Sequence, residues 1–209
     1  LYAALFIEAS VITFTLLLTF SSKGVLRGVR YLLVLSSLAM SLFLLIGWQL
    51  SGGNISPVDE TQLQISVNVI SLSFMLWMGI FPFNAWMQMI SREHAEIDTT
   101  FFFTIFTTSM IFLLLQSLNL FSWFKQFPAV MPAIEALGII MMVVNSIPLA
   151  VDPFNRERIA NWSGFSLGII LLAISINTTD SMHIALILLL ARNLCLCGLG
   201  DFFSRYSGT

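Results

Sequence analysis

Seven apolar stretches, each about as long as a helix that crosses a bilayer, fill almost the whole chain. A hydrocarbon core about 30 Å thick needs about 20 mainly apolar residues in helical form. We place the stretches at 1–20, 31–50, 65–86, 101–121, 131–150, 161–176 and 182–200. The sequence therefore predicts an all-α, polytopic transmembrane helix bundle of about seven spans.

Composition agrees with a membrane protein. Hydrophobic residues make up 57% of the chain and charged residues only 10%, whereas soluble domains carry about 25% charged residues. No polar, Gly/Ser-rich or Pro-rich segment divides the sequence, so residues 1–209 are predicted to form a single transmembrane domain. The first stretch contains Glu8 and lacks both a basic region and a small-residue cleavage site, which indicates a span rather than a cleavable signal.

Basic residues fall almost entirely in alternate connections between the stretches, and this bias predicts orientation. The odd connections and the C-terminal segment carry seven of them: Lys23, Arg27, Arg30, Arg92, Arg156, Arg158 and Arg205. The even connections carry only Lys125. We therefore expect the N-terminus outside and the C-terminus inside.

Motifs for soluble-style catalysis are missing from the sequence. It contains no glycine-rich nucleotide loop, Cys/His metal pair or nucleophile elbow, and no basic run interleaved with aromatic residues that favours nucleic acid. Cys195 and Cys197 point about 200° apart on a helix, which favours apolar filling over a disulfide or metal site. We expect no active site, cofactor, metal or nucleic-acid partner of the chain's own.

The third stretch carries the most specific local chemistry, WMGIFPFNAW at 77–86. Pro82 removes a backbone donor and clashes with the carbonyl of Met78, and Gly79 weakens the same turn. A helix broken at Pro82 is predicted, with Gly79, Pro82 and Asn84 as the broken-helix residues. Broken helices line ion or substrate cavities in transporters, although a proline kink accommodated by packing is the alternative.

Two ionisable residues lie inside predicted spans, where a charge costs about 2.5–3.5 kcal/mol even on the lenient insertion scale. Glu8 lies in the first stretch and Arg192 in the last, next to Asn193. Both are candidates for an ion pathway, and snorkelling to the membrane surface is the alternative. His94 and His183 are predicted to be solvated or interfacial.

Five segments, in order, carry a resemblance to a known family. LFIEASVITFTLLLTF resembles a helix with a glutamate after apolar or aromatic residues, matched by Glu8. GVRYLLVLSSLAMSLFLLIG resembles the next helix, with Arg30 at the position of a lysine. GIFPFNAW resembles a PFHxW stretch that ends a broken helix, with Asn84 in place of the histidine. DPFNRERIANWSGFSLGIILLAI resembles a basic loop leading into a helix, and LLLARNLCLCGLG places Arg192 at a basic position.

The chain thus resembles the antiporter-like membrane subunits shared by respiratory complex I, photosynthetic NDH complexes, membrane-bound hydrogenases and Mrp-type antiporters. The likeness covers nearly the whole chain and corresponds to helices five to eleven of about fourteen. It implies a place among other membrane subunits of an energy-converting complex, in a bacterial inner, mitochondrial inner or thylakoid membrane. It also implies Glu8, Arg192 and Arg30 as ion-pathway candidates, with protons or Na⁺ as the ions.

The sequence departs from this family where ion conduction depends on basic residues. Pumping members carry a lysine five residues before the proline and another basic residue in the following helix, whereas this chain has Trp77 and, approximately, Thr108. The departure favours a structural relative with impaired or absent conduction. The alternatives are an active proton or Na⁺ translocating subunit that uses Glu8 and Arg192, and a pigment- or quinone-holding membrane subunit.

Overall fold

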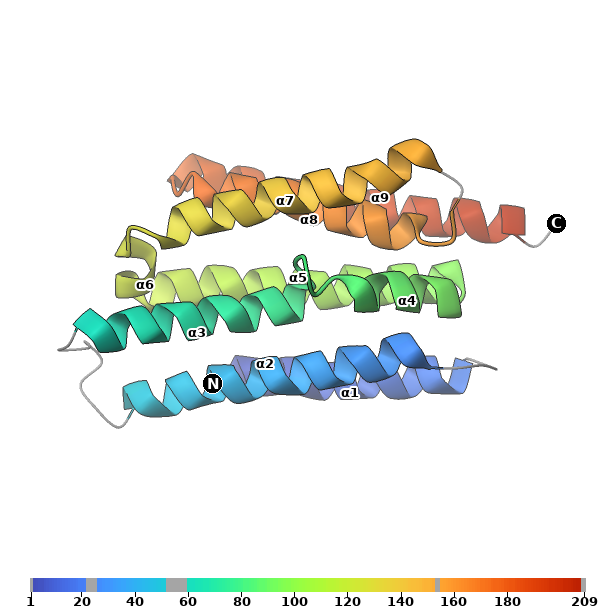
Figure 1. Ribbon diagram of the computed structural model, residues 1–209. Helices are drawn as coiled ribbons and strands as arrows, with labels where there is room; N and C mark the ends of the chain where they lie inside the picture. Colours follow the sequence, from blue (N-terminus) through green and yellow to red (C-terminus); the bar gives the residue numbers. More distant parts are fainter. Residues whose placement is uncertain (1, 22–25, 52–59, 153–154, 208–209) are drawn as a thin grey trace.

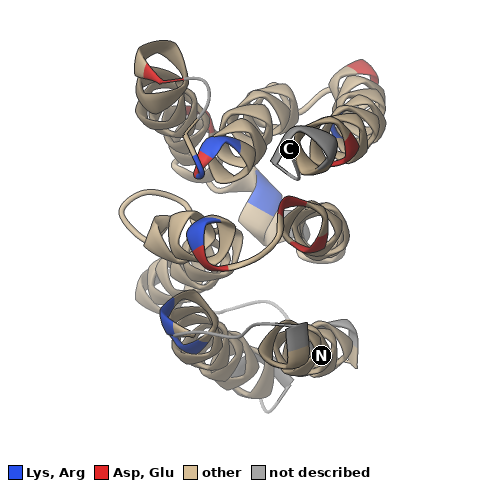
Figure 2. Cartoon of the chain, turned by 90° about the vertical axis from the view of Figure 1, so that its right-hand side faces the viewer, with Lys and Arg blue, Asp and Glu red and all other residues tan. Residues whose placement is uncertain are grey.

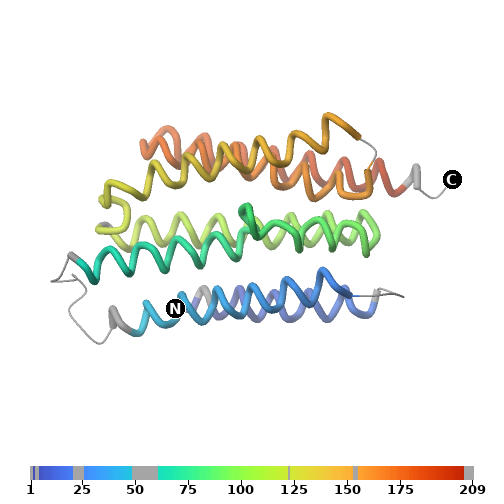
Figure 3. The backbone as a smooth tube through the Cα atoms, viewed as in Figure 1, coloured from blue at the N-terminus to red at the C-terminus, as the bar shows by residue number. Residues whose placement is uncertain are grey.

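The chain folds into α-helices that lie side by side in three layers (Figures 1 and 3). The computed structural model describes residues 2–21, 26–51, 60–152 and 155–207. In these ranges the helices are α1 (Tyr2–Ser21), α2 (Arg27–Ser51), α3 (Glu60–Met78), α4 (Ala85–Glu93), α5 (Glu96–Leu120), α6 (Ser122–Gln126), α7 (Val130–Val151), α8 (Arg158–Ser175) and α9 (Thr179–Ser207). The prediction of an all-α fold is confirmed.

Five helices of the described ranges are long and apolar enough to cross a membrane, which fits a multi-pass membrane protein. They are Arg27–Trp48, Glu96–Leu120, Val130–Val151, Arg158–Ser175 and Thr179–Ser204. Helix α1 contributes a shorter apolar segment, Leu5–Phe20, and α3 stops at Met78 in the middle of the third predicted stretch. The count of seven spans therefore stays a prediction, with α1 and the α3–α4 pair as the remaining two.

Helix α5 is central to the arrangement. It lies in the middle layer with α3, α4 and α6, between a layer of α1 and α2 and a layer of α7, α8 and α9 (Figure 1). It contacts α1 on one side and α8 and α9 on the other. Helices α5 and α8 are the most buried of the five candidate spans, and α7 and α9 the most exposed. The apolar outer faces of α7 and α9 suit lipid contact.

Aromatic rings fill the contact between α4 and α5. Trp86 is 1% exposed and meets Phe102, Phe103 and Phe106 with edge-to-face geometry at centroid distances of 6.2, 6.0 and 5.7 Å. Edge-to-face pairs stabilise beyond their buried area. The short helix α4 is thereby held against α5 although it is only nine residues long.

Glycines allow α7 and α8 to approach closely. A Cβ added at Gly168 would lie 2.7 Å from the carbonyl oxygen of Gly138, and one added at Gly164 would lie 2.6 Å from the Asn145 side chain. Small residues at such positions let helix backbones pack together in a membrane, where van der Waals contact rather than the hydrophobic effect drives association. This pair is the most extensive helix contact of the described chain.

Charged residues gather at one end of the bundle. Helices α1, α4, α7 and α9 end there and α2, α5 and α8 begin there, on the right of Figure 1. Figure 2 looks at this end and shows basic and acidic segments at neighbouring helix ends. We call it the basic end, because the connections that follow the first, third and fifth predicted stretches meet there, and these connections carry most of the basic residues. Lys23 lies outside the described residues, as does the side chain of Arg205.

Candidate functional site

The helical path is interrupted midway along the bundle, between α3 and α4 (Figure 3). Helix α3 ends at Met78, the chain turns through residues 79–84, and α4 begins at Ala85. Gly79 has φ +61°, a left-handed conformation that favours glycine. A Cβ there would also lie 2.8 Å from Trp86 Nε1. Both observations require glycine at position 79.

New backbone contacts replace the helical ladder at this interruption. The Ile80 N–H donates to the Met75 carbonyl at 3.0 Å, and the Phe83 N–H donates to the Ile80 carbonyl at 2.7 Å. Asn84 is buried, 9% exposed, and precedes α4 without donating or accepting a side-chain capping bond. Ile80 and Asn84 of the turn are buried, whereas Phe81 and Pro82 between them are exposed.

Glu8 lies half-buried on α1 and binds two hydroxyl groups of α2. Ser36 Oγ donates to Glu8 Oε2 at 2.5 Å, and Ser37 Oγ donates to Glu8 Oε1 at 3.3 Å. The Trp77 indole N–H in turn donates to Ser36 Oγ at 3.3 Å. A short relay thus runs from the end of α3 through α2 to the carboxylate, and every donor in it is neutral.

Trp77 is fixed in this relay by packing. It is 1% exposed, and its ring lies 5.6 Å from Phe43 and 6.2 Å from Phe74. Trp77 therefore belongs to an aromatic cluster between α2 and α3. It stands at the position where the resemblance implies a lysine. An indole at this place donates a hydrogen bond but carries no exchangeable charge.

Arg192 lies buried among α5, α8 and α9, with 4% of its surface exposed. Its Nη2 donates to Ser163 Oγ at 2.6 Å, its Nε to Ser166 Oγ at 3.1 Å and its Nη1 to Asn193 Oδ1 at 3.2 Å. No carboxylate of the described residues pairs with it. The guanidinium is thus a buried cation solvated by neutral oxygens, and it does not snorkel to the surface.

The two candidate centres lie in different parts of the bundle. Glu8 belongs to the α1–α2–α3 contact, and Arg192 belongs to the α5–α8–α9 contact. In the described part of the chain no hydrogen bond or ion pair joins them. Arg30 is exposed on the first turn of α2 at the basic end, away from both centres.

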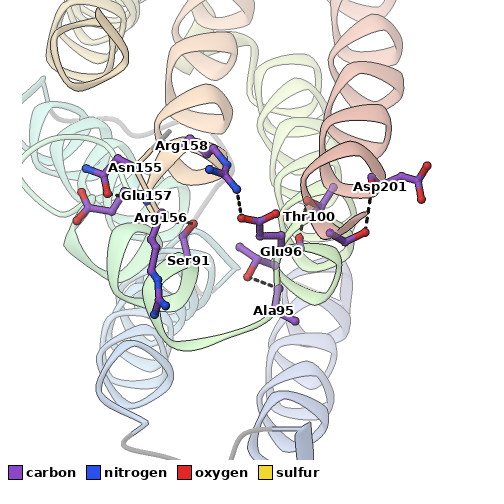
Figure 4. A network of polar contacts seen from close by, with 11 residues as sticks. Ser91, Ala95, Glu96, Thr100, Asn155, Arg156, Glu157, Arg158 and Asp201 are labelled. Carbon is purple, nitrogen blue, oxygen red and sulfur yellow. Dashed lines mark hydrogen bonds and ion pairs between the residues drawn. The ribbon is translucent and has the colours of Figure 1, made fainter. Parts of the chain in front are cut away.

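A polar network at the basic end escaped sequence reasoning. Arg158 at the start of α8 pairs with Glu96 at the start of α5 (Figure 4), and Arg92 of α4 pairs with Glu157. The Glu93 carboxylate accepts from the N–H groups of Arg27 and Gly28 at 3.1 and 2.9 Å. A carboxylate is favourable at a helix N-terminus, where free N–H groups point outward. The polar segment from Arg92 to Asp98 therefore ties α2, α4, α5 and α8 together.

Arg158 makes a second contact that strengthens its place in this network. Its guanidinium carbon lies 3.7 Å from the centroid of the Phe203 ring on α9, a cation–π distance. The side chains of Arg158 and Glu96 are 11% and 15% exposed. In the sequence, the acidic residues of the 92–98 segment are the only sign of this network. Their partners Arg27 and Arg158 lie about sixty residues away along the chain, so the sequence does not indicate the pairing.

His94 is more buried than expected, and its protonation affects stability. Burial lowers the pKa of His94 below 6.5, against the raising effect of Glu93 and Asp98. The unfolded chain then binds a proton at higher pH than the folded one, so stability is full above about pH 6.5 and falls as pH drops below it. We expect acidification from about pH 7.5 to about pH 5.5 to lower the apparent melting temperature, and His94→Gln to reduce that drop.

Thermal unfolding of the purified protein in detergent measures this effect. His183→Gln is the matched control, because His183 is exposed on α9 and its replacement should leave the drop unchanged. An equal drop in wild type and His94→Gln would contradict the prediction.

Comparison with known proteins gives no match: no family model matches the chain, and no curated protein matches its sequence. The assignment of function therefore rests on the residues and their geometry.

Proposed function

We propose that the chain is a divergent antiporter-like membrane subunit of an energy-converting assembly, and that it serves as a helical scaffold without conducting ions itself. The observation that carries this proposal is the environment of Glu8. Its carboxylate accepts from Ser36 and Ser37, and Trp77 donates to Ser36. Proton exchange between buried groups depends on a neighbouring charge that shifts the pKa. The neutral relay provides no such charge.

Proton pumping by the whole complex tests the proposal. Glu8→Gln keeps the shape of the side chain and one of its two acceptor oxygens, and removes the titratable group. We expect reconstituted complexes with Glu8→Gln to pump protons at the wild-type rate per electron pair, with normal assembly on native gels. Collapse of the gradient by an uncoupler verifies the sensitivity of the assay. A large loss of coupling in a normally assembled complex would contradict the scaffold.

Translocation of protons or Na⁺ is the second candidate function. It is favoured by the retention of a carboxylate at Glu8 next to the broken helix, and by a buried cation at Arg192. Ionisable groups in spans commonly mark ion pathways. The loss of coupling described above is the outcome that would support this candidate.

The orientation that we propose places the basic end on the inner face of an energy-transducing membrane. The clustering of Arg27, Arg30, Arg92 and Arg156 at or near one end of the bundle supports it through the positive-inside rule. Single cysteines at Asn155 near the basic end and at Gln126 near the opposite end, with Cys195 and Cys197 replaced by serine, report the orientation. In intact cells or organelles, an impermeant thiol reagent should label position 126 and spare position 155. The reverse pattern would overturn the orientation.

A further inference from the structure

Helix α7 turns one broad face away from the bundle. In the described part of the chain it packs closely only against α8 and, near its start, against α6. Its buried residues repeat every three or four positions, which places them on one side of the helix: Val130, Ile134, Gly138, Met141 and Asn145. The other side, which we call the outer face of α7, exposes Ala133, Glu135, Ala136, Ile139, Val143 and Ile147.

Glu135 is the only charged residue of α7, and it has no partner inside the bundle. Other polar side chains of the spans do have one. Glu8 accepts from Ser36, and Asn193 Nδ2 donates to Thr108 Oγ1 at 3.0 Å. Glu135 is exposed, and in the described part of the chain it makes no hydrogen bond or ion pair.

The position of Glu135 along α7 places its carboxylate within the apolar layer of a membrane. Helix α7 has 22 residues, about 33 Å at 1.5 Å per residue, for a hydrocarbon core of about 30 Å. Glu135 lies about 7.5 Å along the helix from its first residue. The polar level at this end lies further out, at α6, which carries Lys125 and lies beyond the start of α7 in Figure 1.

Neither the helix terminus nor lipid explains a carboxylate at this position. The helix macrodipole favours acidic residues within the first turn, and Glu135 lies in the second turn of α7. Snorkelling to the surface relies on the long side chains of lysine and arginine. A charge that faces hydrocarbon is expensive, and charges in spans are usually paired. The apolar residues of the outer face suit lipid, whereas Glu135 requires an opposite charge.

Small residues next to Glu135 leave room for another helix. Ala133 and Ala136 flank it on the outer face and are exposed. Small side chains let the backbones of two helices approach closely in a membrane. An unpaired carboxylate between two alanines therefore favours a protein neighbour with a basic side chain over lipid chains.

We propose that the outer face of α7 is an interface with a transmembrane helix of another subunit, and that this helix carries an arginine or lysine that pairs with Glu135. The basic residue lies about two turns from the end of the partner helix, at the depth of Glu135. The inference rests on the proposed place of the chain in a larger assembly and names the surface that meets the neighbour. It holds whether or not the chain conducts ions.

Charge reversal tests the pairing in the whole complex. Glu135→Lys places two cations at the same point of the interface, and like charges oppose association. We expect the share of the chain that is incorporated into the complex, measured on native gels against the total chain in the membrane, to fall at least about tenfold. The melting temperature of the isolated variant in detergent should equal that of the wild type, because Glu135 is exposed and pairs with no group of its own chain.

Two further variants make this test specific. Asp180→Lys is the matched control, since Asp180 is exposed near the start of α9 at the same end of the bundle, and it should be incorporated normally. Glu135→Leu suits lipid but leaves the partner's cation unpaired, so its incorporation should also fall. Normal incorporation of Glu135→Leu or of Glu135→Lys would overturn the interface and assign Glu135 to the lipid headgroups.

Shape gives a second measurement that leaves the charge in place. Ala136→Trp keeps Glu135 and fills the space beside it. Lipid chains move aside for an indole ring, whereas a closely packed helix does not. We expect Ala136→Trp to lower incorporation without changing the melting temperature of the isolated chain, and normal incorporation would overturn the proposal. A wild-type chain that joins no larger complex would contradict the proposed function together with this interface, so the two failures are distinguishable.

Discussion

Trp77→Ala is expected to lower the free energy of unfolding by about 3–5 kcal/mol, the range for deletion of a buried aromatic side chain. Trp77 is 1% exposed and packs against Phe43 and Phe74. Its removal leaves a cavity between α2 and α3 and deprives Ser36 of a donor. Reversible unfolding in mixed detergent micelles measures the change.

Trp77→Phe separates packing from hydrogen bonding at the same position. It keeps an aromatic ring in the cluster and loses the indole N–H that donates to Ser36. A single neutral hydrogen bond contributes about 0.5–1.5 kcal/mol, so the cost of Trp77→Phe should be well below that of Trp77→Ala. A cost below about 1 kcal/mol for Trp77→Ala would mean that this cluster does not hold α3 to α2.

Arg158→Met is expected to destabilise the protein by about 3–5 kcal/mol, because it leaves a largely buried carboxylate without its cation. Glu96 is the carboxylate concerned, and its side chain is 15% exposed. The change also removes the cation from the Phe203 ring. The same unfolding measurement in micelles reports the loss.

Two further variants isolate the ion pair. Arg158→Met combined with Glu96→Gln removes the stranded charge, so the double variant should recover much of the lost stability. Arg30→Met removes an exposed arginine at the same end and should change stability by less than about 0.5 kcal/mol. A double variant as unstable as Arg158→Met alone would show that the charge of Glu96 is not the cause.

The third predicted stretch is divided between α3 and α4 in the structure. Gly79 and Pro82 indicated an interruption from local backbone rules alone, and α3 ends one residue before Gly79. That the break results from Pro82 at membrane depth stays a prediction. For Arg192 the sequence left open both an ion-pathway position and snorkelling to the membrane surface, and the structure decided that it is buried.

The partners of these residues were beyond sequence reasoning. Nothing in the first apolar stretch indicates that Glu8 meets Ser36 and, through it, Trp77. Nor does the segment from Arg92 to Asp98 indicate that Glu96 pairs with Arg158. In the sequence, Ser36 and Thr108 look like ordinary helix residues. Their importance follows only from which helix lies opposite.

The sequence by itself determined the helical class, the membrane as solvent and the clustering of basic residues in alternate connections. Each of these follows from short-range properties: hydrophobic runs of span length, backbone breakers and charge between spans. The tertiary structure alone decided which polar groups meet, since those pairs are 28, 62 and 85 residues apart. Helix packing depends on side-chain shape across neighbouring faces, and residue type along one helix does not specify the face that will lie opposite.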